Sequence, residues 1–539
     1  MTGSPFFSKR TVRQVMALLG ALPIIAAAQT TRTCPPEGPW DVGNHRQLFI
    51  DHRFVAESFN VELRVHKPTK TGEMNIKPDK PWEVGGIGPY SSVLKDGDTY
   101  HMWYHTMTSV QWDTDKYAGA ICYARSKDGI VWEKPNLGLT EFQGTKDNNI
   151  VLGQGAAGLK VGQDGGMVFV DPNAPADERF RMFIPYGETG PGIHIFSSPD
   201  GIRWKLTHKS VVTARPQATG HHLDSQNVMF WDDSIKKYVF YGRRNMNTPS
   251  SQGRSIARGE SADLKSFPVV QDMPVVIAPD RFDDYPGQGP VVDYYMSAAV
   301  KYPFAADAYF MFPTAYYHYI GGGILPEFKD KIPTNAGPLD SQFAASRDGL
   351  LWQRYDRRPF VPLGMKGEFD WANTRVIYGL VPSADGQHLY LYYRGGDWLH
   401  GWDRNVSNKK LLTDAGLGAD KDIAVLSRVV LRMDGFVSVR GAYTGGEFTT
   451  PLLKFAGGKL VLNIDTSAIG IAQVEILDDR GLIIDGFSQT DCDLIHTANE
   501  INRTVSWKGN RDLSKLAGRP IRLRFFLRDA DLYAFQFTK

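Results

Sequence analysis

Apolar and polar residues alternate along most of this chain in short runs, which is the period of a β-strand with one buried face. One unit recurs: an apolar strand, a polar turn and a second strand rich in aromatic residues. Copies of it occupy residues 92–94 and 100–104, 167–169 and 181–184, 228–230 and 238–241, 298–300 and 309–312, and 378–380 and 389–393. The pattern predicts five antiparallel units, each of about four strands.

A seven-residue motif, S-x-D-G-x-x-W, follows three of these units. It covers residues 126–132, 198–204 and 346–352, with weaker copies at residues 261–267 and 432–436. Asp-Gly is a strong turn dipeptide because glycine tolerates a positive φ and the aspartate bonds to the turn backbone. We therefore predict structural turns on the outer rim, with each Trp filling a gap between sheets. No catalysis is assigned to Asp128, Asp200 or Asp348.

Repeated four-stranded units arranged radially form a β-propeller. The predicted fold class is all-β, with a five-bladed β-propeller over residues 40–436 and a C-terminal β-sandwich over residues 437–539. A ring closes best when both chain ends share a blade, so early strands at residues 48–51 and 53–55 are expected to complete the fifth blade. The sandwich rests on short alternating strands at residues 460–464, 472–477, 504–507, 521–527 and 532–537.

The first 28 residues have the pattern of a secretory signal peptide. Lys9, Arg10 and Arg13 give a basic start, and an apolar run from Val15 ends in three alanines at Ala28. The run is shorter than the ~20 apolar residues that cross a bilayer, so no membrane span is predicted. The mature protein is expected to be secreted or periplasmic.

The charge balance argues against a nucleic-acid partner. The chain has 61 Lys and Arg against 59 Asp and Glu in 539 residues, and removal of residues 1–28 takes away three basic residues and no acidic one. Such a chain lacks the basic footprint that nucleic acid requires. Cys34, Cys122 and Cys492 allow one disulfide, whose pairing the sequence leaves open. Cys122 lies in an alternating strand and is expected to be a small core residue.

The chemistry is expected at the mouth of the propeller channel, where the innermost strand of each blade begins. An acidic residue precedes that strand in each unit: Glu83, Asp164, Asp224, Asp293 and Glu368. Two convergent carboxylates suit glycosidic cleavage, because one protonates the leaving oxygen while the other attacks the sugar carbon or activates water. The predicted catalytic residues are Asp224, Asp293, Glu83 and Asp164.

Aromatic, polar and acidic side chains near these strand starts are predicted to bind the sugar. Aromatic rings offer apolar faces for sugar stacking, and histidines can hydrogen-bond to hydroxyls. The predicted substrate-binding residues are Tyr90, His222, Gln226, Tyr294, His318, Glu368, Asp370, Trp371 and His400. The histidines lack partners at zinc-ligand spacing, so no metal site and no cofactor is predicted, with a structural Ca²⁺ ion left open. The expected partner is an oligo- or polysaccharide substrate.

The stretches at residues 100–105, 124–135 and 146–151 resemble the five-bladed glycoside hydrolases of families 32, 43 and 68, in particular secreted bacterial proteins with a family 32 N-terminal-like domain. The resemblance implies cleavage of furanosides or related glycans by carboxylates from blades one, three or nearby, and four. The chain departs from the family 32 pattern. The place of the first aspartate reads G-P-Y-S at residues 88–91, and the blade-four acid is Asp293 where a Glu is usual.

Two other functions remain open at this point. The missing carboxylate in the first blade favours a non-catalytic glycan-binding surface protein. The Asp-Gly turns resemble the Asp boxes of sialidases, although those boxes have an extra residue before the glycine and sialidases have six blades and an arginine cluster. Fold alone does not decide among the three, because one fold hosts many chemistries.

Overall fold

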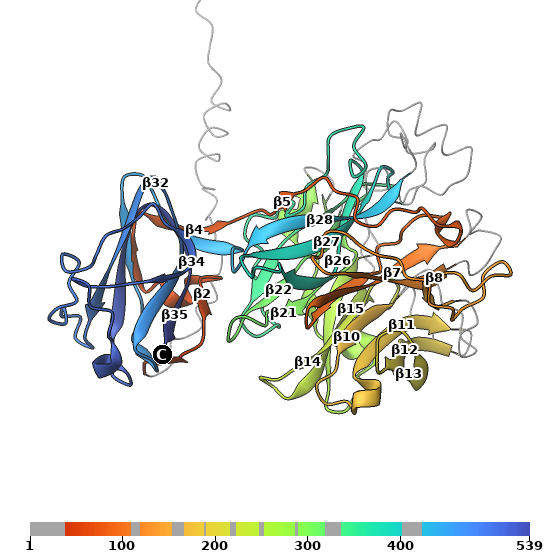
Figure 1. Ribbon diagram of the computed structural model, residues 1–539, viewed down its shortest axis with the longest axis horizontal. Helices are drawn as coiled ribbons and strands as arrows, with labels where there is room; N and C mark the ends of the chain where they lie inside the picture. Colours follow the sequence, from red (N-terminus) through yellow and green to blue (C-terminus); the bar gives the residue numbers. More distant parts are fainter. Residues whose placement is uncertain are drawn as a thin grey trace, which may run out of the picture.

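The computed structural model describes residues 38–108, 119–153, 166–187, 190–215, 222–246, 253–285, 289–290, 292–318, 336–400 and 423–539. They form an all-β protein of two lobes, the smaller of which holds the C-terminus (Figure 1). The described helices are short 3-10 turns: η1 (His52–Phe54), η2 (Pro81–Glu83), η4 (Ala176–Glu178), η5 (Val270–Asp272), η6 (Arg281–Asp283) and η8 (Ser514–Leu516). None of these helices has the length and hydropathy to cross a membrane.

Three antiparallel arrays of four strands follow one another in the larger lobe and are called sheets one, two and three. Sheets two and three are separate, whereas sheet one is joined by parallel pairing to strands of later units in one 11-stranded sheet. Sheet one is built from β6 (Ser92–Asp96), β7 (Thr99–Met107), β8 (Gly119–Ser126) and β9 (Ile150–Leu152). Sheet two is built from β10 (Met167–Val170), β11 (Phe180–Gly187), β12 (Gly190–Ser198) and β13 (Lys205–Val212). Sheet three is built from β14 (Val228–Asp232), β15 (Lys237–Asn245), β16 (Arg254–Ser261) and β17 (Val275–Ile277). The first two strands of each sheet are those that the alternation predicts.

Two further sheets complete the larger lobe. Sheet four is split into two antiparallel parts, β20 (Val292–Tyr294), β23 (Thr314–Tyr317) and β24 (Leu339–Ser341), and β21 (Val300–Lys301), β22 (Tyr309–Met311) and β25 (Ala344–Ser346). Sheet five is built from β26 (Asn373–Pro382), β27 (His388–Gly396), β28 (Ala424–Arg432) and β5 (Thr69–Lys70). A separate pair is formed by β18 (Asp284–Tyr285) and β19 (Gly289–Pro290).

Every copy of the turn motif begins at the last residue of a third strand, namely Ser126, Ser198, Ser261, Ser346 or Arg432. In the first copy, Asp128 Oδ1 accepts hydrogen bonds from the backbone N–H groups of Ile130 and Val131 at 2.8 and 2.9 Å. Asp200 and Asp348 make the same pair of bonds in their own turns. The prediction of a structural role for these aspartates is confirmed.

Each full copy of the motif contacts a neighbouring sheet: the copy in sheet one contacts sheet five, the copy in sheet two contacts sheet one, and the copy in sheet four contacts sheet three. The glycine carbonyls accept hydrogen bonds from second strands: Gly129 from Tyr392, Gly201 from Trp103 and Gly349 from Tyr241. The motif tryptophans pack edge-on against the same three rings at centroid distances of 5.7, 6.4 and 5.9 Å. The tryptophans therefore fill gaps between sheets, as predicted.

Contacts between neighbouring sheets run through all five and return to the first. The glycine contacts join sheets five and one, one and two, and three and four. In addition, β10 of sheet two packs against β14 of sheet three. Leu339 of sheet four pairs with Asn373 of sheet five, and Tyr378 of sheet five pairs with Ser92 of sheet one. Each sheet therefore touches two others.

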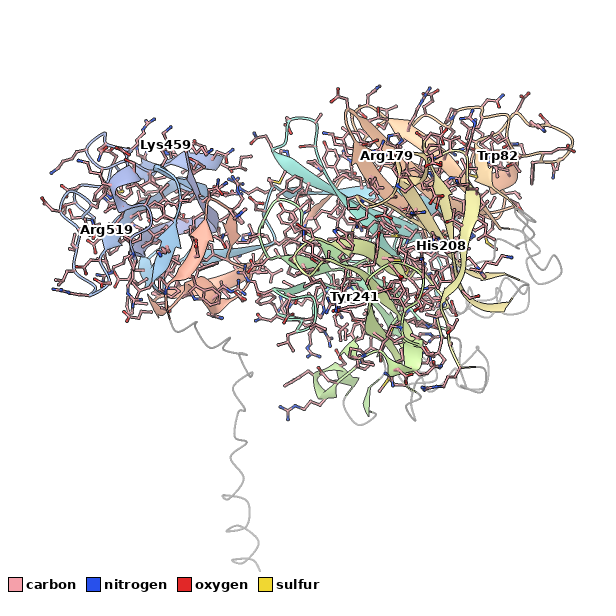
Figure 2. The ribbon with its side chains drawn as sticks, turned by 90° about the horizontal axis from the view of Figure 1, so that it is seen from below. Trp82, Arg179, His208, Tyr241, Lys459 and Arg519 are labelled. Atoms are coloured by element: carbon pink, nitrogen blue, oxygen red, sulfur yellow. The ribbon has the colours of Figure 1, made fainter. Side chains whose placement is uncertain are left out.

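The smaller lobe combines strands from both ends of the described chain. Its N-terminal strands are β1 (Trp40–Gly43), β2 (Gln47–Leu48), β3 (Glu57–Phe59) and β4 (Val61–Val65). Its C-terminal strands are β29 (Val437–Gly441), β30 (Gly446–Thr449), β31 (Leu453–Phe455), β32 (Lys459–Leu477), β33 (Ile495–His496), β34 (Asn499–Thr504) and β35 (Arg522–Thr538). Figure 2 shows Lys459 and Arg519 on this lobe and Tyr241 inside the larger one.

The prediction that residues 48–51 and 53–55 complete the fifth blade was wrong. β2 pairs with β35 of the smaller lobe, and residues 52–54 form η1. The reason is burial, because Phe49 and Phe54 pack on Phe448 and Phe535 with ring centroids 5.5 and 5.2 Å apart. The fourth strand of sheet five is β5, which pairs with β28.

Two pairs of predicted strands in the smaller lobe are fused. Residues 460–464 and 472–477 both lie in β32, and most of residues 521–527 and 532–537 lie in β35. The pairing of β32 with β35 shifts register between Thr466 and Ile471. Such a bulge interrupts the alternation of apolar and polar residues within one continuous strand, so the pattern predicts two strands there. Cys122 and Cys492 are buried free thiols, as expected of Cys122, and Cys34 lies outside the described residues.

Candidate functional site

Asp293 of β20 is fully buried and firmly bound. Its Oδ1 accepts a hydrogen bond from the backbone N–H of Arg254 at 3.0 Å, and its Oδ2 lies 2.6 Å from Arg254 Nη1 and 2.8 Å from His318 Nε2. Burial alone would raise the pKa of this carboxyl, but the bond to His318 and the charge of Arg254 outweigh burial and lower the pKa to about 2. Asp293 is therefore ionised at neutral pH.

Asp224 precedes β14 and is more open than Asp293. Its side chain is 25% exposed, and its Oδ2 lies 3.2 Å from Arg243 Nη2. The residues on either side, Leu223 and Ser225, have φ angles of 63° and 81°, a region that costs side-chain-bearing residues about 1–2 kcal/mol each. Asn227 holds this backbone in place, because its Nδ2 donates to the carbonyls of both residues at 2.8 and 3.1 Å.

Four buried arginines lie close enough to His400 for their charges to act on its imidazole. They are Arg243 of β15, Arg254 at the start of β16, Arg375 of β26 and Arg394 of β27, each at most 5% exposed. The guanidinium carbons of Arg243, Arg254 and Arg375 lie 5.0, 5.4 and 5.3 Å from the ring centroid of Tyr295. Two sheets thus direct positive charge at one aromatic side chain.

The pKa of His400 is lowered by burial and by the positive charge of these four arginines. Its ring centroid lies 4.9 Å from that of Tyr295 and 4.8 Å from that of Tyr316. Burial, together with the charges of all four arginines, holds the pKa of His400 well below its ordinary value of 6.5. The imidazole is therefore neutral. We call Asp224, Arg243, Arg254, Asp293, Tyr295, Tyr316, Arg375, Arg394 and His400 the central cluster.

Three other predicted residues border the central cluster. The hydroxyl of Tyr90 lies 3.5 Å from that of Tyr295. Gln226 donates from Nε2 to the carbonyl of Ser91 at 2.7 Å, and its Oε1 is buried without a hydrogen-bond partner. The Nδ1 of His222 lies 3.2 Å from the backbone N–H of Asn245, and burial and neighbouring arginines lower its pKa.

Glu83 lies on η2, and its contacts are with residues outside the central cluster. Its carboxylate accepts hydrogen bonds from Lys134 Nζ at 2.8 Å, from Tyr104 at 2.6 Å and from the backbone of Asp79 at 2.9 Å. The side chain is fully buried by these partners. Glu83 therefore anchors the loop that carries it, and none of these contacts reaches the central cluster.

Glu368, Asp370, Trp371 and Tyr294 likewise make contacts elsewhere. Glu368 is exposed and accepts from a backbone N–H within its own turn, and Lys366 covers the ring of Trp371. Asp370 binds Lys70 at 2.5 Å, and Tyr294 donates to Asp283 at 3.0 Å. Tyr294 faces away from Asp293 because neighbouring residues of a strand point to opposite faces. Asp164 lies outside the described residues.

Another carboxyl with a perturbed pKa, Asp340 of β24, lies on that opposite face. Asp293 shares its row of paired residues with Tyr316 and Leu339, whereas Asp340 pairs with Ala315 in the next row. Burial raises the pKa of Asp340 to about 7, and its Oδ1 has no hydrogen-bond partner. A raised pKa suits a general acid, but strand geometry separates Asp340 from the central cluster.

The arginines are the members of the central cluster that sequence reasoning missed. A signal was present in the repeat. Tyr241 and Tyr392 occupy equivalent positions, since each donates to a motif glycine, and Arg243 and Arg394 follow each of them by two residues. Aligning the second strands on the turn motif would have placed both arginines at one level of the fold. Reading only the strand starts selected acids instead.

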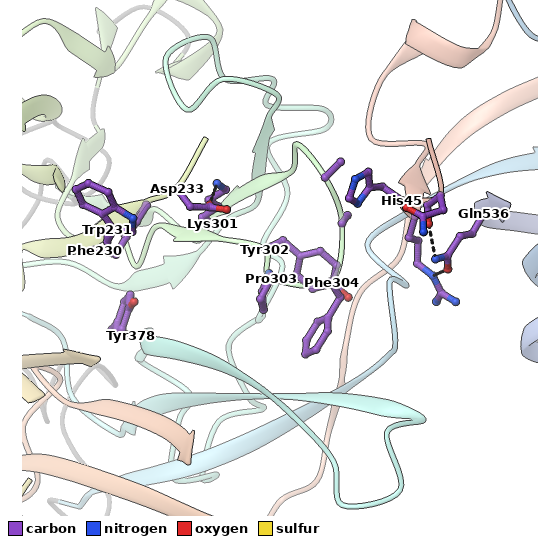
Figure 3. Close-up of a pocket in the computed structure, with 14 residues that line it drawn as sticks. His45, Phe230, Trp231, Asp233, Lys301, Tyr302, Pro303, Phe304, Tyr378 and Gln536 are labelled. Atoms are coloured by element: carbon purple, nitrogen blue, oxygen red, sulfur yellow. Dashed lines mark hydrogen bonds and ion pairs between the residues drawn. The ribbon is translucent and has the colours of Figure 1, made fainter. Parts of the chain in front are cut away.

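A hollow lies between the two lobes, away from the central cluster (Figure 3). It has a volume of about 650 Å³ and is lined by Trp231, Lys301, Phe304 and Tyr378 of the larger lobe and by Arg46 and Gln536 of the smaller. None of the predicted site residues lines it. Among the described residues, no group of three or more His, Cys, Asp and Glu side chains is placed to hold a metal ion.

Comparison with known proteins finds no matching family model. Two uncharacterized proteins of Mycobacterium tuberculosis, from strains H37Rv and CDC 1551, are each 29% identical to this chain over 120 residues, which is 22% of this chain. The match spans about a third of those relatives, or 34% of their length.

Several solved structures are similar at low sequence identity. A structure of a BT0996–RGII complex has a TM-score of 0.46 and 13% identity over 68% of this chain and 92% of its own. A family 43 arabinoxylan arabinofuranohydrolase from Bacillus subtilis has a TM-score of 0.36 and 12% identity over 88% and 99%. An N-acetylgalactosamine deacetylase from F. plautii has a TM-score of 0.41 and 12% identity over 70% and 97%. These likenesses are loose, so function has to be read from the side chains.

Proposed function

We propose that this protein is a glycoside hydrolase that acts on furanosides or related glycans at the central cluster. The observation that carries the proposal is the pair of aspartates from sheets three and four, Asp224 and Asp293, whose arginine partners Arg243 and Arg254 both lie over the ring of Tyr295. Aromatic rings and a pair of carboxylates are the equipment that glycosidic cleavage uses. Glu83 and Asp370, whose carboxylates are engaged elsewhere, are left out of this set.

The two aspartates would have different roles. Asp293 stays ionised, so its negative charge would stabilise the positive sugar carbon that develops as the bond breaks. Asp224 is partly exposed and would exchange a proton with the leaving oxygen or with water. The neutral His400 and the amide of Gln226 would hydrogen-bond to sugar hydroxyls.

Release of reducing ends from a panel of plant and bacterial polysaccharides tests this proposal. Once a cleaved glycan is found, Asp224→Asn is expected to lower kcat by about 10²–10⁴-fold, since a general acid or base supplies that factor. Glu368→Gln is the matched control, because this exposed carboxylate serves only its own turn. Full activity of Asp224→Asn would overturn the assignment.

One observation favours a second function, glycan binding without cleavage. Arg254 and His318 already occupy both oxygens of Asp293, which leaves this carboxylate little freedom to attack a sugar. Binding of a polysaccharide with no reducing ends released, by wild type and by Asp224→Asn alike, would establish this second function.

We also propose the architecture and the compartment. The cycle of contacts through five sheets supports a five-bladed β-propeller, and the strand pairing supports a C-terminal β-sandwich that includes residues 40–65. The basic and apolar start of the sequence supports export to the periplasm or the medium. Mass spectrometry of the exported protein should find a new N-terminus after Ala28, and an uncut chain in the cytoplasm would contradict export.

A further inference from the structure

Among the described residues, the arginines around Tyr295 outnumber the carboxylates whose ion pairs with them the structure shows. Arg243, Arg254 and Arg375 surround this ring, and the described ion pairs bring two carboxylates, Asp224 to Arg243 and Asp293 to Arg254. All three guanidinium groups are nearly excluded from water. Burying a charge costs several kcal/mol unless it is paired, so an excess of buried cations marks a place adapted to an incoming anion.

Arg375 is the clearest example of a buried arginine without a described carboxylate partner. It is 5% exposed and forms no ion pair within the described part of the chain. Its Nε is buried without a hydrogen-bond partner, and its guanidinium stacks on the face of Tyr295. The Nε of Arg254 and the Oε1 of Gln226 are also buried without partners. Unpaired polar atoms thus gather from sheet five, from sheet three and from the loop that leads into sheet three.

We propose that the central cluster binds an oxyanion carried by the sugar substrate, namely the carboxylate of an acidic sugar or a sulfate ester, with Arg375 and Arg254 as its principal donors. Guanidinium groups match both anions because they offer two parallel N–H donors in a fixed plane. This inference rests on the proposed function and adds the class of substrate.

An anionic substrate also removes a difficulty in the proposed chemistry. Glycosidic cleavage develops positive charge on the sugar carbon. The nearby guanidinium groups would oppose that charge in a neutral substrate, whereas the substrate's own anion would neutralise part of the arginine charge. Arg254 connects the carboxylate of Asp293 with the proposed anion site, since it binds Asp293 through Nη1 while its Nε stays unpaired.

Calorimetric titration with paired sugars tests the inference. The probes are oligomers of galacturonate, oligomers of glucuronate and a sialyl-oligosaccharide, each next to its neutral methyl ester, together with a galactose-sulfate oligosaccharide next to its desulfated form. At least one anionic member should bind tenfold or more tightly than its neutral partner. Binding limited to the sulfated probe would identify the ester as the source. Equal binding of every pair would overturn the inference.

Arg375→Gln separates a binding role from a structural one. We expect at least a tenfold loss of affinity for the preferred anion, with a melting temperature that is unchanged or higher, because an unneutralised buried charge is removed. The matched control is Arg258→Gln. Arg258, in sheet three, is buried as Arg375 is, but it has an ion-pair partner, Glu260, which would keep Lys237 as its other partner. The control should bind normally. A drop of several degrees for Arg375→Gln with unchanged affinity would show that this arginine only supports the fold.

The inference and the proposed function fail in different ways. Cleavage of a neutral glycan with no preference for an acidic one would overturn the anion site and leave the hydrolase. Tight binding of an acidic glycan without released ends, abolished by Arg375→Gln, would overturn the hydrolase and leave the anion site.

Discussion

At the scale of single residues, burial decides which side chains can do chemistry in this protein. Asp293 and Asp340 both lie in sheet four, yet one has its pKa lowered to about 2 and the other has its pKa raised to about 7. The difference follows from partners, because Asp293 has Arg254 and His318 whereas Asp340 faces only the distant charge of Lys67.

Asp340 should therefore make stability depend on pH. Burial raises the pKa of Asp340 from 3.8 to about 7, so the folded state binds the proton more tightly than the unfolded state. Stability is then expected to fall as pH rises from about 4 to 7 and to stay low above that. Asp340→Asn should raise the free energy of unfolding at pH 8 by about 2–4 kcal/mol and flatten this dependence.

Urea unfolding of both proteins at pH 5 and pH 8 measures this effect. Asp263→Asn serves as the control, since Asp263 is exposed in its turn and should shift neither value. An Asp340→Asn protein that gains nothing at pH 8 relative to pH 5 would contradict a protonated Asp340.

At the scale of elements, the glycine of an Asp-Gly turn has two roles. It allows the left-handed backbone of the turn, and it lets the turn pack closely against a ring of the neighbouring sheet. Gly201 has a φ of 73°, and an added Cβ would lie 2.5 Å from the ring of Trp103. Gly138 has a φ of 66°, but an added Cβ there would meet nothing within 4 Å. Both glycines have a left-handed backbone that would strain any residue with a Cβ. They differ in the space that such a Cβ would find.

Gly201→Ala should therefore destabilise the protein more than Gly138→Ala. Left-handed strain costs about 1–2 kcal/mol at either site, and displacing Trp103 adds about 1–3 kcal/mol at Gly201 alone. Thermal unfolding followed by tryptophan fluorescence measures both. Equal losses would mean that the turn does not press on the neighbouring sheet.

At the scale of the whole molecule, arginines help to hold the lobes together, among them Arg347, with Arg53–Asp307 and Arg46–Asp434 as further ion pairs between the same parts. Arg347, within the turn motif that ends sheet four, binds Asp51 Oδ1 at 3.0 Å and Asp307 Oδ1 at 2.9 Å, and it donates to the carbonyl of Leu48. Asp51 and Leu48 belong to the N-terminal segment that pairs with β35, so this side chain bridges the two lobes.

Arg347→Gln should weaken the coupling between the lobes. Breaking a buried ion pair, which leaves Asp51 only the backbone N–H and the charge of Arg53, is expected to cost about 3 kcal/mol, and calorimetry should show the smaller lobe unfolding at a lower temperature than the larger. Lys127→Gln is the matched control, because Lys127 holds the same motif position in sheet one but contacts only Thr99. A single unshifted transition for Arg347→Gln would show that other contacts join the lobes.

The sequence by itself determined the local features of this protein. Alternation located the paired strands, and the Asp-Gly motif located the turns and the packing role of Trp132, Trp204 and Trp352, because both signals act between residues close in the chain. Asp224, Gln226 and Asp293 could also be singled out from the sequence, since each precedes a predicted strand, and the structure places them in or next to the central cluster.

Only the tertiary structure decided which distant residues meet. Residues 40–65 joined the smaller lobe because Phe49 and Phe54 find their apolar partners there, nearly 500 residues away in the case of Phe535. The central cluster proved rich in arginine because strands from separate sheets converge on Tyr295. Periodicity says which face of a sheet a side chain occupies, but the arrangement of sheets decides what that face meets.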